Sequence, residues 1–365
     1  MLQGTPFHPR TAALCQGRNW RRWSKYVVAG SYELSPEREY WAIRNSAALL
    51  DVTPLYKYLF SGRDAARVVN RIVTRNVEKC AVHQVMYTPW CNEHGQVLDD
   101  GTVARLDENV FRVTSADPNY RWFCENAYGF DVHLQDVSDT TAALALQGPL
   151  SREILKQSAD ANLDALGYFR LTPARLRNIR VTISRTGYTG DLGYEIWCEA
   201  QDALALWDTL MEVGDAYGIT PTGILALDMA RIEAGLILID KENFVGKRAL
   251  VQEKQRGFEW QFMGLDVEWE SLEEIYARKG LHPQLPMTAW RASTPLYVEN
   301  KQVGYASSGV WSPLLKKYIA LAHLRKPHFE PGYWVDMEVT VEHERQTARA
   351  RVVKLPFLEL ERKRK

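Results

Sequence analysis

The sequence predicts an α+β fold that ends in an all-β domain. Two observations support this prediction. Up to about residue 240, β-rich apolar runs alternate with segments that have helical spacing and helix-start signals. Beyond Lys241 the pattern changes to short β-rich runs separated by turns, which is typical of a small barrel. The chain has 365 residues, enough for about two or three domains of ordinary size.

Residues 1–140 are expected to begin with an irregular arm and to continue into alternating helices and strands. The first thirty residues carry aromatic and basic side chains without clean periodicity. Ser35 and Pro36 are typical of a helix start, and we expect this helix to end near Leu49. A strand is predicted at residues 56–60 and a helix after Ser61. Residues 85–113 alternate strands with turn signals, which predicts antiparallel hairpins.

The next hundred residues continue the alternation. A strand is predicted at residues 143–146 and a helix from about Ser151. A β-branched strand at residues 180–184 leads into three glycines at a spacing of three: Gly187, Gly190 and Gly193. Such spacing predicts a backbone that bends tightly or approaches a ligand closely. Helical faces then indicate two helices, at residues 203–213 and 224–234.

The C-terminal third is predicted to be all β. Its strand-like runs are at residues 260–267, 302–305, 319–324 and 334–341. The final residues 361–365 are rich in charge, and we expect a solvated tail there.

The composition restricts the possible partners. The chain carries 45 Lys and Arg against 45 Asp and Glu, so its formal net charge is zero. Proteins that bind nucleic acid by counterion release need a strong positive field, so no nucleic acid partner is expected. The longest apolar stretch, residues 234–239, is far shorter than the roughly 18 residues of a membrane span. No membrane partner is expected either.

Cysteine and histidine usage argues against disulfides and metals. The five cysteines are scattered and never form a C-x-x-C pair, which indicates a reducing, cytoplasmic setting. The eight histidines lack ligand spacing, so no metal site is expected. No dinucleotide fingerprint, P-loop or H-E-x-x-H motif occurs, and we expect neither a nicotinamide nor a flavin.

Two places in the sequence are candidates for chemistry. Asp99 and Asp100 follow a glycine turn, and because neighbouring residues of a strand point to opposite faces, only one of them can face a site. In the second place, Tyr188 and Glu195 flank the glycine-rich segment and can converge on one flat ligand. Each has an ordinary alternative: two carboxylates that decorate a hairpin, and a simple β-turn.

Several ordered motifs resemble the tetrahydrofolate-dependent aminomethyltransferase family, which includes the glycine cleavage T-protein and folate-dependent demethylases. The motifs extend over nearly the whole chain: Asp51-Val52-Thr53, Asn92-Glu93-His94-Gly95 with Asp99-Asp100, Ala145-Leu146-Gln147-Gly148-Pro149, Arg185-Thr186-Gly187-Tyr188-Thr189-Gly190, Gly193-Tyr194-Glu195 and Phe244-Val245-Gly246-Lys247. The resemblance implies a three-domain cloverleaf. Residues 1–54 and 141–240 would form a discontinuous folate-binding domain, residues 55–140 a second α+β domain, and residues 241–365 a β-barrel-like domain.

The resemblance also implies roles for individual residues. Asp100 matches the family's catalytic aspartate, and Glu195 matches the carboxylate that holds the pterin. The expected aromatic walls are Tyr87, Tyr168 and Tyr188, and Ser115 falls near the family's polar asparagine. A carboxylate suits the pterin because the ring presents an amino group beside a ring N–H, two parallel donors that one carboxylate can accept.

Departures from the family pattern affect which one-carbon donor is expected. Leu227 stands where the T-protein carries an arginine, and Thr114-Ser115 stands where an asparagine is expected. Both changes make glycine cleavage less favoured. The Phe244 motif also follows Asp240 almost at once, whereas the family has a further segment there. We expect a mobile loop to be missing from the sequence between Asp240 and Lys241, rather than a true deletion.

These features favour a demethylase that moves a methyl or one-carbon group from a small methylated substrate to N5 of tetrahydrofolate. An ammonium, a sulfonium or a methoxyaromatic compound is a suitable donor, and aromatic faces attract onium cations. The alternatives are a T-protein aminomethyltransferase, which would need a lipoylated carrier protein, and a non-catalytic folate-binding regulatory protein.

Overall fold

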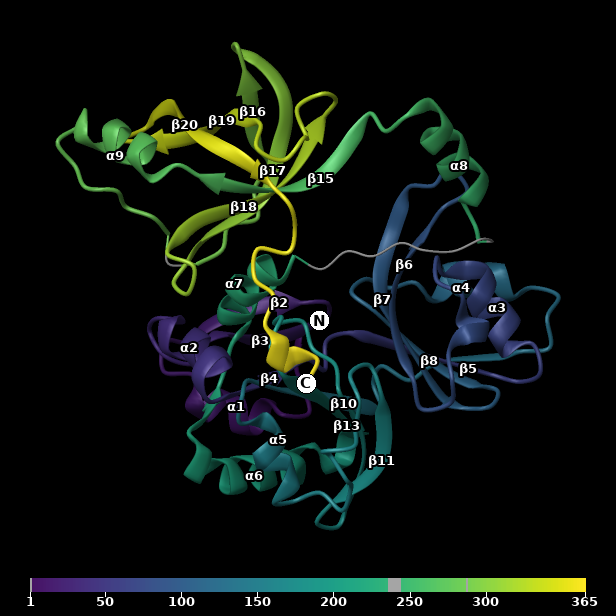
Figure 1. Ribbon diagram of the computed structural model, residues 1–365. Helices are drawn as coiled ribbons and strands as arrows, with labels where there is room; N and C mark the ends of the chain where they lie inside the picture. Colours follow the sequence, from purple (N-terminus) through teal and green to yellow (C-terminus); the bar gives the residue numbers. More distant parts are fainter. Residues whose placement is uncertain (1, 236–243, 287) are drawn as a thin grey trace.

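The computed structural model describes residues 2–235, 244–286 and 288–365 and has three lobes (Figure 1). A six-stranded sheet lies in the first lobe, a five-stranded sheet in the second, and the closed barrel in the third. The expected loop between Asp240 and Lys241 lies outside the described residues. In the part of the chain that is described, no helix has the length and apolar character needed to cross a bilayer.

The N-terminal residues are ordered, so the prediction of an irregular arm is wrong. They form a three-stranded sheet in the order β1-β3-β2, together with one helix. The elements are β1 (Gln3–Gly4), α1 (His8–Leu14), β2 (Asn19–Trp23) and β3 (Tyr26–Ser31). The central strand β3 is buried at nearly every position, so its sequence has none of the polar alternation that marks a half-exposed strand.

A six-stranded sheet forms the centre of the first lobe, in the order β11-β12-β13-β10-β4-β14. Its strands are β4 (Ala47–Asp51), β10 (Thr141–Gln147), β11 (Leu171–Leu176), β12 (Ile179–Ser184), β13 (Gly193–Glu199) and β14 (Ile219–Pro221). The helices with it are α2 (Glu37–Asn45), α5 (Ser151–Lys156), α6 (Ala203–Gly214) and α7 (Ile224–Ala234).

The helices predicted near residues 203–213 and 224–234 are confirmed. The helix that starts near Ser35 ends at Asn45, however, and not near Leu49. Residues 47–50 are buried in strand β4, and a short run that is apolar on all sides fits a buried strand as well as a helix.

A five-stranded antiparallel sheet forms the second lobe, in the order β6-β7-β8-β5-β9. Its elements are β5 (Tyr56–Ser61), α3 (Ala65–Ile72), β6 (Val85–Cys91), β7 (Val97–Asp107), β8 (Val110–Ser115), α4 (Tyr120–Ala127) and β9 (His133–Asp136). The predicted hairpins are confirmed. One face of the sheet packs on α3 and α4 around Phe60, Phe111 and Phe123.

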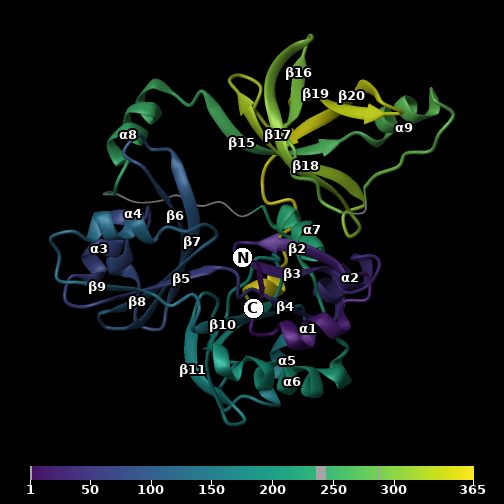
Figure 2. The same cartoon turned by 180° about the vertical axis from the view of Figure 1, so that it is seen from behind.

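The C-terminal domain is a closed six-stranded barrel, which confirms the all-β prediction. Its strands are β15 (Trp260–Val267), β16 (Thr294–Val298), β17 (Lys301–Ser312), β18 (Lys317–Arg325), β19 (Trp334–Val341) and β20 (Glu344–Val353). Helix α8 (Lys247–Arg256) precedes it and α9 (Trp269–Ala277) lies at its side. Figure 2 shows α8 beside the tip of the β6–β7 hairpin, where a Cβ on Gly246 would collide with the carbonyl of Asn92.

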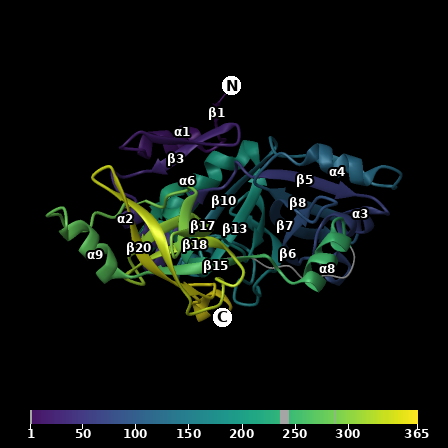
Figure 3. The same cartoon turned by 90° about the horizontal axis from the view of Figure 1, so that it is seen from above.

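The prediction of a solvated C-terminal tail is wrong for Arg362 and Lys363, which dock on the first lobe, whereas Glu361, Arg364 and Lys365 are exposed as expected. The Arg362 guanidinium donates to Asp191 from Nε (2.6 Å) and Nη2 (2.8 Å). Arg185 also donates to the carbonyl of Lys363. Figure 3 shows the C-terminal segment and the N-terminal sheet on opposite sides of the molecule. The high charge of residues 361–365 suggested that they face solvent, but the Arg362 guanidinium pairs with the buried carboxylate of Asp191.

Candidate functional site

Strand β7 sends its two neighbouring aspartates to opposite faces of the sheet. The Asp99 side chain lies on the buried face with 8% exposure. Its carboxylate accepts hydrogen bonds from the backbone N–H of Asp100 (2.7 Å) and of Asp117 (2.9 Å), and from the Asn119 amide (2.8 Å). Asp99 therefore has a structural role, since three donors already use its oxygens.

Asp100 lies on the opposite face, next to Tyr87 of β6. The register pairs Asp100 with Pro89, so Tyr87 is the next residue of β6 on the same face. The Tyr87 hydroxyl hydrogen-bonds to Asp100, and burial together with that negative charge raises the pKa of Tyr87. The residue after Asp100 is glycine because β8 comes close: a Cβ on Gly101 would collide with the carbonyl of Thr114.

Tyr188 approaches Asp100 from the first lobe. Burial raises the pKa of Tyr188, and the charge of Asp100 adds to the shift. The ring is still 45% exposed, which is typical of a side chain that lines an open site. Tyr87, Asp100 and Tyr188 thus come together although 88 residues separate Asp100 from Tyr188.

The glycine-rich turn that carries Tyr188 is shaped by contacts within the protein. A Cβ on Gly187 or on Gly193 would collide with the Gln147 side chain. Gln147 donates from Nε2 to the carbonyl of Thr186 (3.2 Å) and accepts from the hydroxyl of Thr189 (2.8 Å). Gln147 therefore fixes the turn from inside, and the glycines make room for it rather than for a ligand.

Glu195 is a buried carboxylate on β13. The Thr186 hydroxyl donates to its Oε2 at 2.5 Å. Burial raises the pKa of Glu195, while Thr186 and the nearby charge of Arg112 act in the opposite direction. In the described part of the chain, no hydrogen bond to Oε1 is found, so this oxygen is free to accept from a ligand.

Arg112 of β8 is a site residue that the sequence analysis missed. It is 7% exposed, and its guanidinium lies 3.9 Å from the centroid of the Trp197 ring. Burial lowers its pKa to about 10. Its Nε is buried without a hydrogen-bond partner among the described residues. The available signal was an arginine inside a strand of apolar residues, which is costly unless a partner satisfies it.

Glu195 and Arg112 fit the pterin expected from the sequence. The pterin edge presents two N–H donors beside a carbonyl acceptor. A buried carboxylate can accept the two donors, and the unpartnered Arg112 N–H can supply the matching donor for the carbonyl. The observation that supports this fit is the buried, unsatisfied Nε of Arg112.

Tyr168 and Ser115 lie in different surroundings. Lys363 of the docked C-terminal segment places its ammonium 5.6 Å from the centroid of the Tyr168 ring, and burial raises the pKa of Tyr168 to about 12. Ser115 donates to the carbonyl of Asp117 (2.7 Å). Ser115 directly follows Thr114 in strand β8, so the two side chains point to opposite faces of the sheet. The Thr114 hydroxyl bonds to the hydroxyl of Thr102 on the Asp100 face. Ser115 therefore faces the Asp99 side of the sheet, away from Asp100.

Helix α7 brings a second arginine to the site region. Leu227 packs in an apolar cluster with α2 and the barrel. One turn later, Arg231 pairs with Asp228 (3.2 Å), and Arg291 makes two contacts with the same carboxylate. Arg231 lies close enough to Tyr188 for its charge to oppose the rise of that pKa. The sequence analysis had considered only the loss of an arginine at Leu227.

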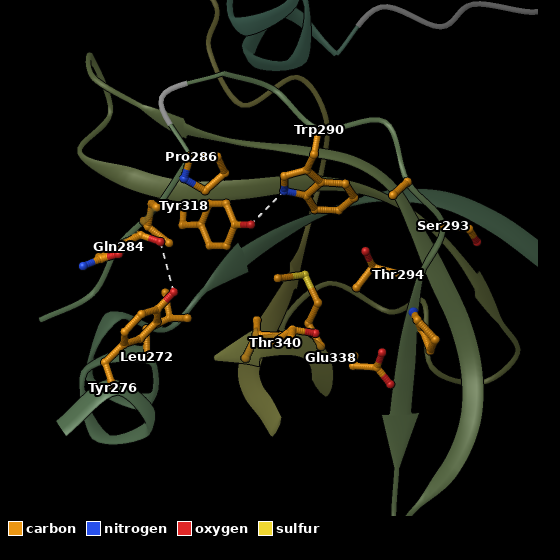
Figure 4. Close-up of a pocket in the computed structure, with 15 residues that line it drawn as sticks. Leu272, Tyr276, Gln284, Pro286, Trp290, Ser293, Thr294, Tyr318, Glu338 and Thr340 are labelled. Carbon is orange, nitrogen blue, oxygen red and sulfur yellow. Dashed lines mark hydrogen bonds between the residues drawn. The ribbon is translucent and has the colours of Figure 1, made fainter. Parts of the chain in front are cut away.

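Two cavities lie outside the Asp100 region. One of about 310 Å³ is in the barrel domain, where the rings of Tyr276, Trp290 and Tyr318 surround it (Figure 4). The other, of about 680 Å³, lies between the end of α7, strand β15 and the C-terminal segment. Among the described residues, no group of three His, Cys, Asp or Glu side chains is placed to hold a metal ion.

Comparisons with known proteins agree with this architecture. Residues 7–245 match the GCVT N-terminal domain, and residues 279–359 match the glycine cleavage T-protein C-terminal barrel domain. The crystal structure of glycine cleavage system aminomethyltransferase T from Bartonella henselae superposes with a TM-score of 0.82 at 21% identity. It covers 98% of this chain and 99% of that chain. At this identity, the likeness supports the fold alone.

Curated relatives are similar over most of the sequence. An aminomethyltransferase from Caldanaerobacter subterraneus is 31% identical, with 82% of each chain covered. An aminomethyltransferase from Halalkalibacterium halodurans is 32% identical, with 88% of this chain and 90% of the relative covered. Trimethylamine-oxide aldolase from Ruegeria pomeroyi is 32% identical over 95% of this chain, but this covers only 46% of that larger protein.

Proposed function

Because this chain belongs to the folate-dependent aminomethyltransferase family of the glycine cleavage T-protein, we propose that it moves a one-carbon group from a small methylated donor to N5 of tetrahydrofolate. The observation that carries the proposal is the convergence of Asp100, Tyr87 and Tyr188 from two lobes. It brings one carboxylate close to two tyrosines, a setting that suits a cationic methyl donor.

Glu195, Arg112 and Tyr168 would hold the folate. Tetrahydrofolate, when bound, supplies a nucleophilic N5 nitrogen that accepts the one-carbon unit. Glu195 can accept the two pterin donors while Thr186 holds its other oxygen in place. Arg112 is kept rigid by its contact with the Trp197 ring, so its free N–H has a fixed direction. Rigid partners lower the entropy lost when a ligand binds.

Asp100 would have two roles, one electrostatic and one in proton transfer. A carboxylate beside a cationic donor stabilises positive charge, and the same group can take up the proton that N5 releases. The Tyr87 hydroxyl orients this carboxylate. Because both oxygens of Asp99 already accept hydrogen bonds inside the protein, Asp100 is the member of the pair that can act on a ligand.

The donor we favour is a methylated ammonium compound, because a neutral amine leaves poorly when its methyl group is transferred. Leu227 removes a positive charge from α7 relative to the pattern of the T-protein, which favours a cationic donor over the aminomethyl group of a lipoylated carrier. One relative is named for action on trimethylamine oxide, which supports methylated nitrogen as the substrate class. Sulfonium and methoxyaromatic donors would use the same carboxylate and rings.

A donor panel tests the proposal. Purified protein is incubated with tetrahydrofolate and with methylated ammonium, sulfonium or methoxyaromatic compounds, and 5-methyltetrahydrofolate is measured by mass spectrometry. We expect folate-dependent transfer of the methyl group from at least one methylated ammonium compound. Demethylation at the same rate without folate would contradict the mechanism.

The second candidate is an aminomethyltransferase of the T-protein type, which the names of the relatives support. A separate assay with glycine-loaded lipoylated carrier protein distinguishes it, since only this activity releases ammonia from the carrier. A purely folate-binding protein would bind tetrahydrofolate and turn over neither kind of donor.

A further inference from the structure

The cavity in the barrel domain is lined by three aromatic rings and one carboxylate. It measures about 310 Å³, at the lower end of the usual range of about 300–1,000 Å³ for small-molecule sites. The rings belong to Tyr276 of α9, Tyr318 of β18 and Trp290, which precedes β16. Glu338 of β19 completes the wall, and Figure 4 shows it around the same space as the rings.

The three rings are held by contacts within the barrel domain. Trp290 Nε1 donates to the Tyr318 hydroxyl (2.7 Å), and the Tyr276 hydroxyl donates to the carbonyl of Gln284 (3.0 Å). The backbone of Trp290 exchanges two hydrogen bonds with Gly309 of β17, and a Cβ on Gly309 would collide with the indole ring. The polar ends of the rings therefore have partners inside the protein. A cavity that is preformed in this way loses less entropy when a ligand binds.

Glu338 is the one charged side chain among the described residues that line the cavity. Its side chain is 19% exposed. The Tyr297 hydroxyl donates to its Oε2 (3.2 Å), and Nε of Arg345 lies 3.8 Å from its Oε1. The Arg345 side chain is 81% exposed, and an ion pair to so mobile a partner contributes little. The wall of the cavity is therefore negative, and a ligand cation can compete for this carboxylate.

Aromatic faces and a carboxylate together select a cation. The faces of Trp and Tyr rings attract an ammonium group within about 6 Å of the ring centroid, and cages of such rings recognise quaternary ammonium ligands. Methyl groups on the nitrogen also pack on the apolar part of the wall, which includes Leu272 and Met337. An anionic ligand would be repelled by Glu338, and an uncharged one would leave this carboxylate without a counter-charge.

The cavity is separate from the Asp100 site. Its lining residues all belong to the barrel domain with α9, and neither Tyr87 nor Tyr188 is among them. The residue that follows Trp290 in the chain is Arg291, whose side chain pairs with Asp228 of α7. A ligand that contacts Trp290 therefore binds one residue away from an ion pair between the barrel and the first lobe.

We propose that this cavity is a second ligand site, which binds a small organic cation with a methylated ammonium group. Tyr276, Trp290 and Tyr318 surround the ammonium group, and Glu338 supplies the counter-charge. The site does not depend on the proposed function, because it needs neither Asp100 nor folate.

Calorimetric titration of the full chain with choline tests the site. The protein carries Asp100→Asn and no folate is added, so that the Asp100 carboxylate cannot hold the cation. We expect choline to bind at least about tenfold more tightly than 3,3-dimethyl-1-butanol, its uncharged analogue of the same shape. Adding Glu338→Gln should weaken choline binding by about tenfold. Glu274→Gln, at an exposed position of α9, is the matched control and should keep the full affinity.

A second variant tests the aromatic wall. Tyr276→Leu removes one ring at a half-buried position, and choline binding should weaken by about fivefold. Urea denaturation of each variant shows that the barrel is still folded. Full choline affinity in folded Tyr276→Leu or Glu338→Gln protein would contradict the site.

The remaining outcomes separate this inference from the proposed function. Equal binding of choline and its uncharged analogue, or no binding of choline, would show that the cation site is wrong, while methyl transfer by the wild-type protein would be unaffected. If the wild-type protein transfers no methyl group but choline binding depends on Glu338 and Tyr276, the proposed function fails and the cation site stands.

Discussion

The two faces of the five-stranded sheet use the same strands for opposite purposes. One face packs on α3 and α4 with phenylalanine, valine and tryptophan side chains. The opposite face carries the polar residues Lys57, Tyr87, Asp100, Arg112 and Thr114, because the registers of β5 to β8 bring them to one side. The first face provides cohesion, and the second provides charged groups that are held in place by the first.

The neighbours Asp99 and Asp100 show the difference most clearly. The oxygens of Asp99 accept from three donors inside the protein, whereas the Asp100 carboxylate accepts from the Tyr87 hydroxyl. A carboxylate whose two oxygens both accept from donors inside the protein supports the fold, and one with more free lone pairs can act on a ligand. The comparison teaches that residue type does not decide the role, but the face of the strand does.

The largest expected effect is on turnover, from Asp100→Asn. We expect turnover to fall by about 100-fold or more, since the amide cannot stabilise positive charge or take up a proton. The free energy of unfolding should stay within about 0.5 kcal/mol of the wild-type value. Donor assays and urea denaturation measure the two quantities, and an active Asp100→Asn variant would remove this residue from the mechanism.

Asp99→Ala, unlike Asp100→Asn, should clearly lower the free energy of unfolding. It leaves the Asn119 amide and the two backbone N–H groups of Asp100 and Asp117 without their acceptor. We expect a loss of about 2–4 kcal/mol in the free energy of unfolding. Urea denaturation measures it, with Asp100→Ala as the matched control on the same strand. Equal losses from both variants would contradict the division between the two faces.

Glu195→Gln tests the proposed pterin-binding carboxylate, which is on β13 of the first lobe and not on the five-stranded sheet. The amide cannot accept two donors as a carboxylate does, so we expect the dissociation constant for tetrahydrofolate to rise about 10-fold to 100-fold. Thr186 can still donate to the amide oxygen, which limits the structural change. The control is Glu199→Gln at the exposed end of the same strand, which should leave folate affinity unchanged.

The smallest effect concerns Lys57, whose pKa burial lowers to about 7. Its ammonium donates to the carbonyl of Thr53 at 2.6 Å. An unfolded lysine titrates near pH 10.4, so between these values the unfolded chain binds more protons than the folded one. Stability should therefore rise with pH, on the order of 2 kcal/mol from pH 7 to pH 9 from this group.

Lys57→Met should remove that pH-dependent part. Urea denaturation at pH 7 and pH 9 compares the variant with wild type and with Lys301→Met, which alters an exposed lysine. A pH slope that is the same in all three proteins would show that Lys57 titrates normally on this face.

Several elements and candidate residues followed from local signals. The α+β class, the barrel, the helix at residues 224–234 and the family were predicted from periodicity and from motif order. The N-terminal sheet was missed because β3 is buried at nearly every position, and the docked tail was missed because charge suggests exposure. Arg112 was missed because a single arginine in a strand has no local signature of what it faces.

The sequence by itself determined which residue types stand at which spacing, and therefore the helices, the hairpin with its aspartate pair and the family. Only the tertiary structure decided which aspartate of the pair faces the site, and that Gln147 rather than a ligand fills the space beside two glycines. It also showed that Lys363 reaches Tyr168. The physical reason is that these contacts join residues far apart in the chain, and local periodicity carries no information about which distant group satisfies a charge.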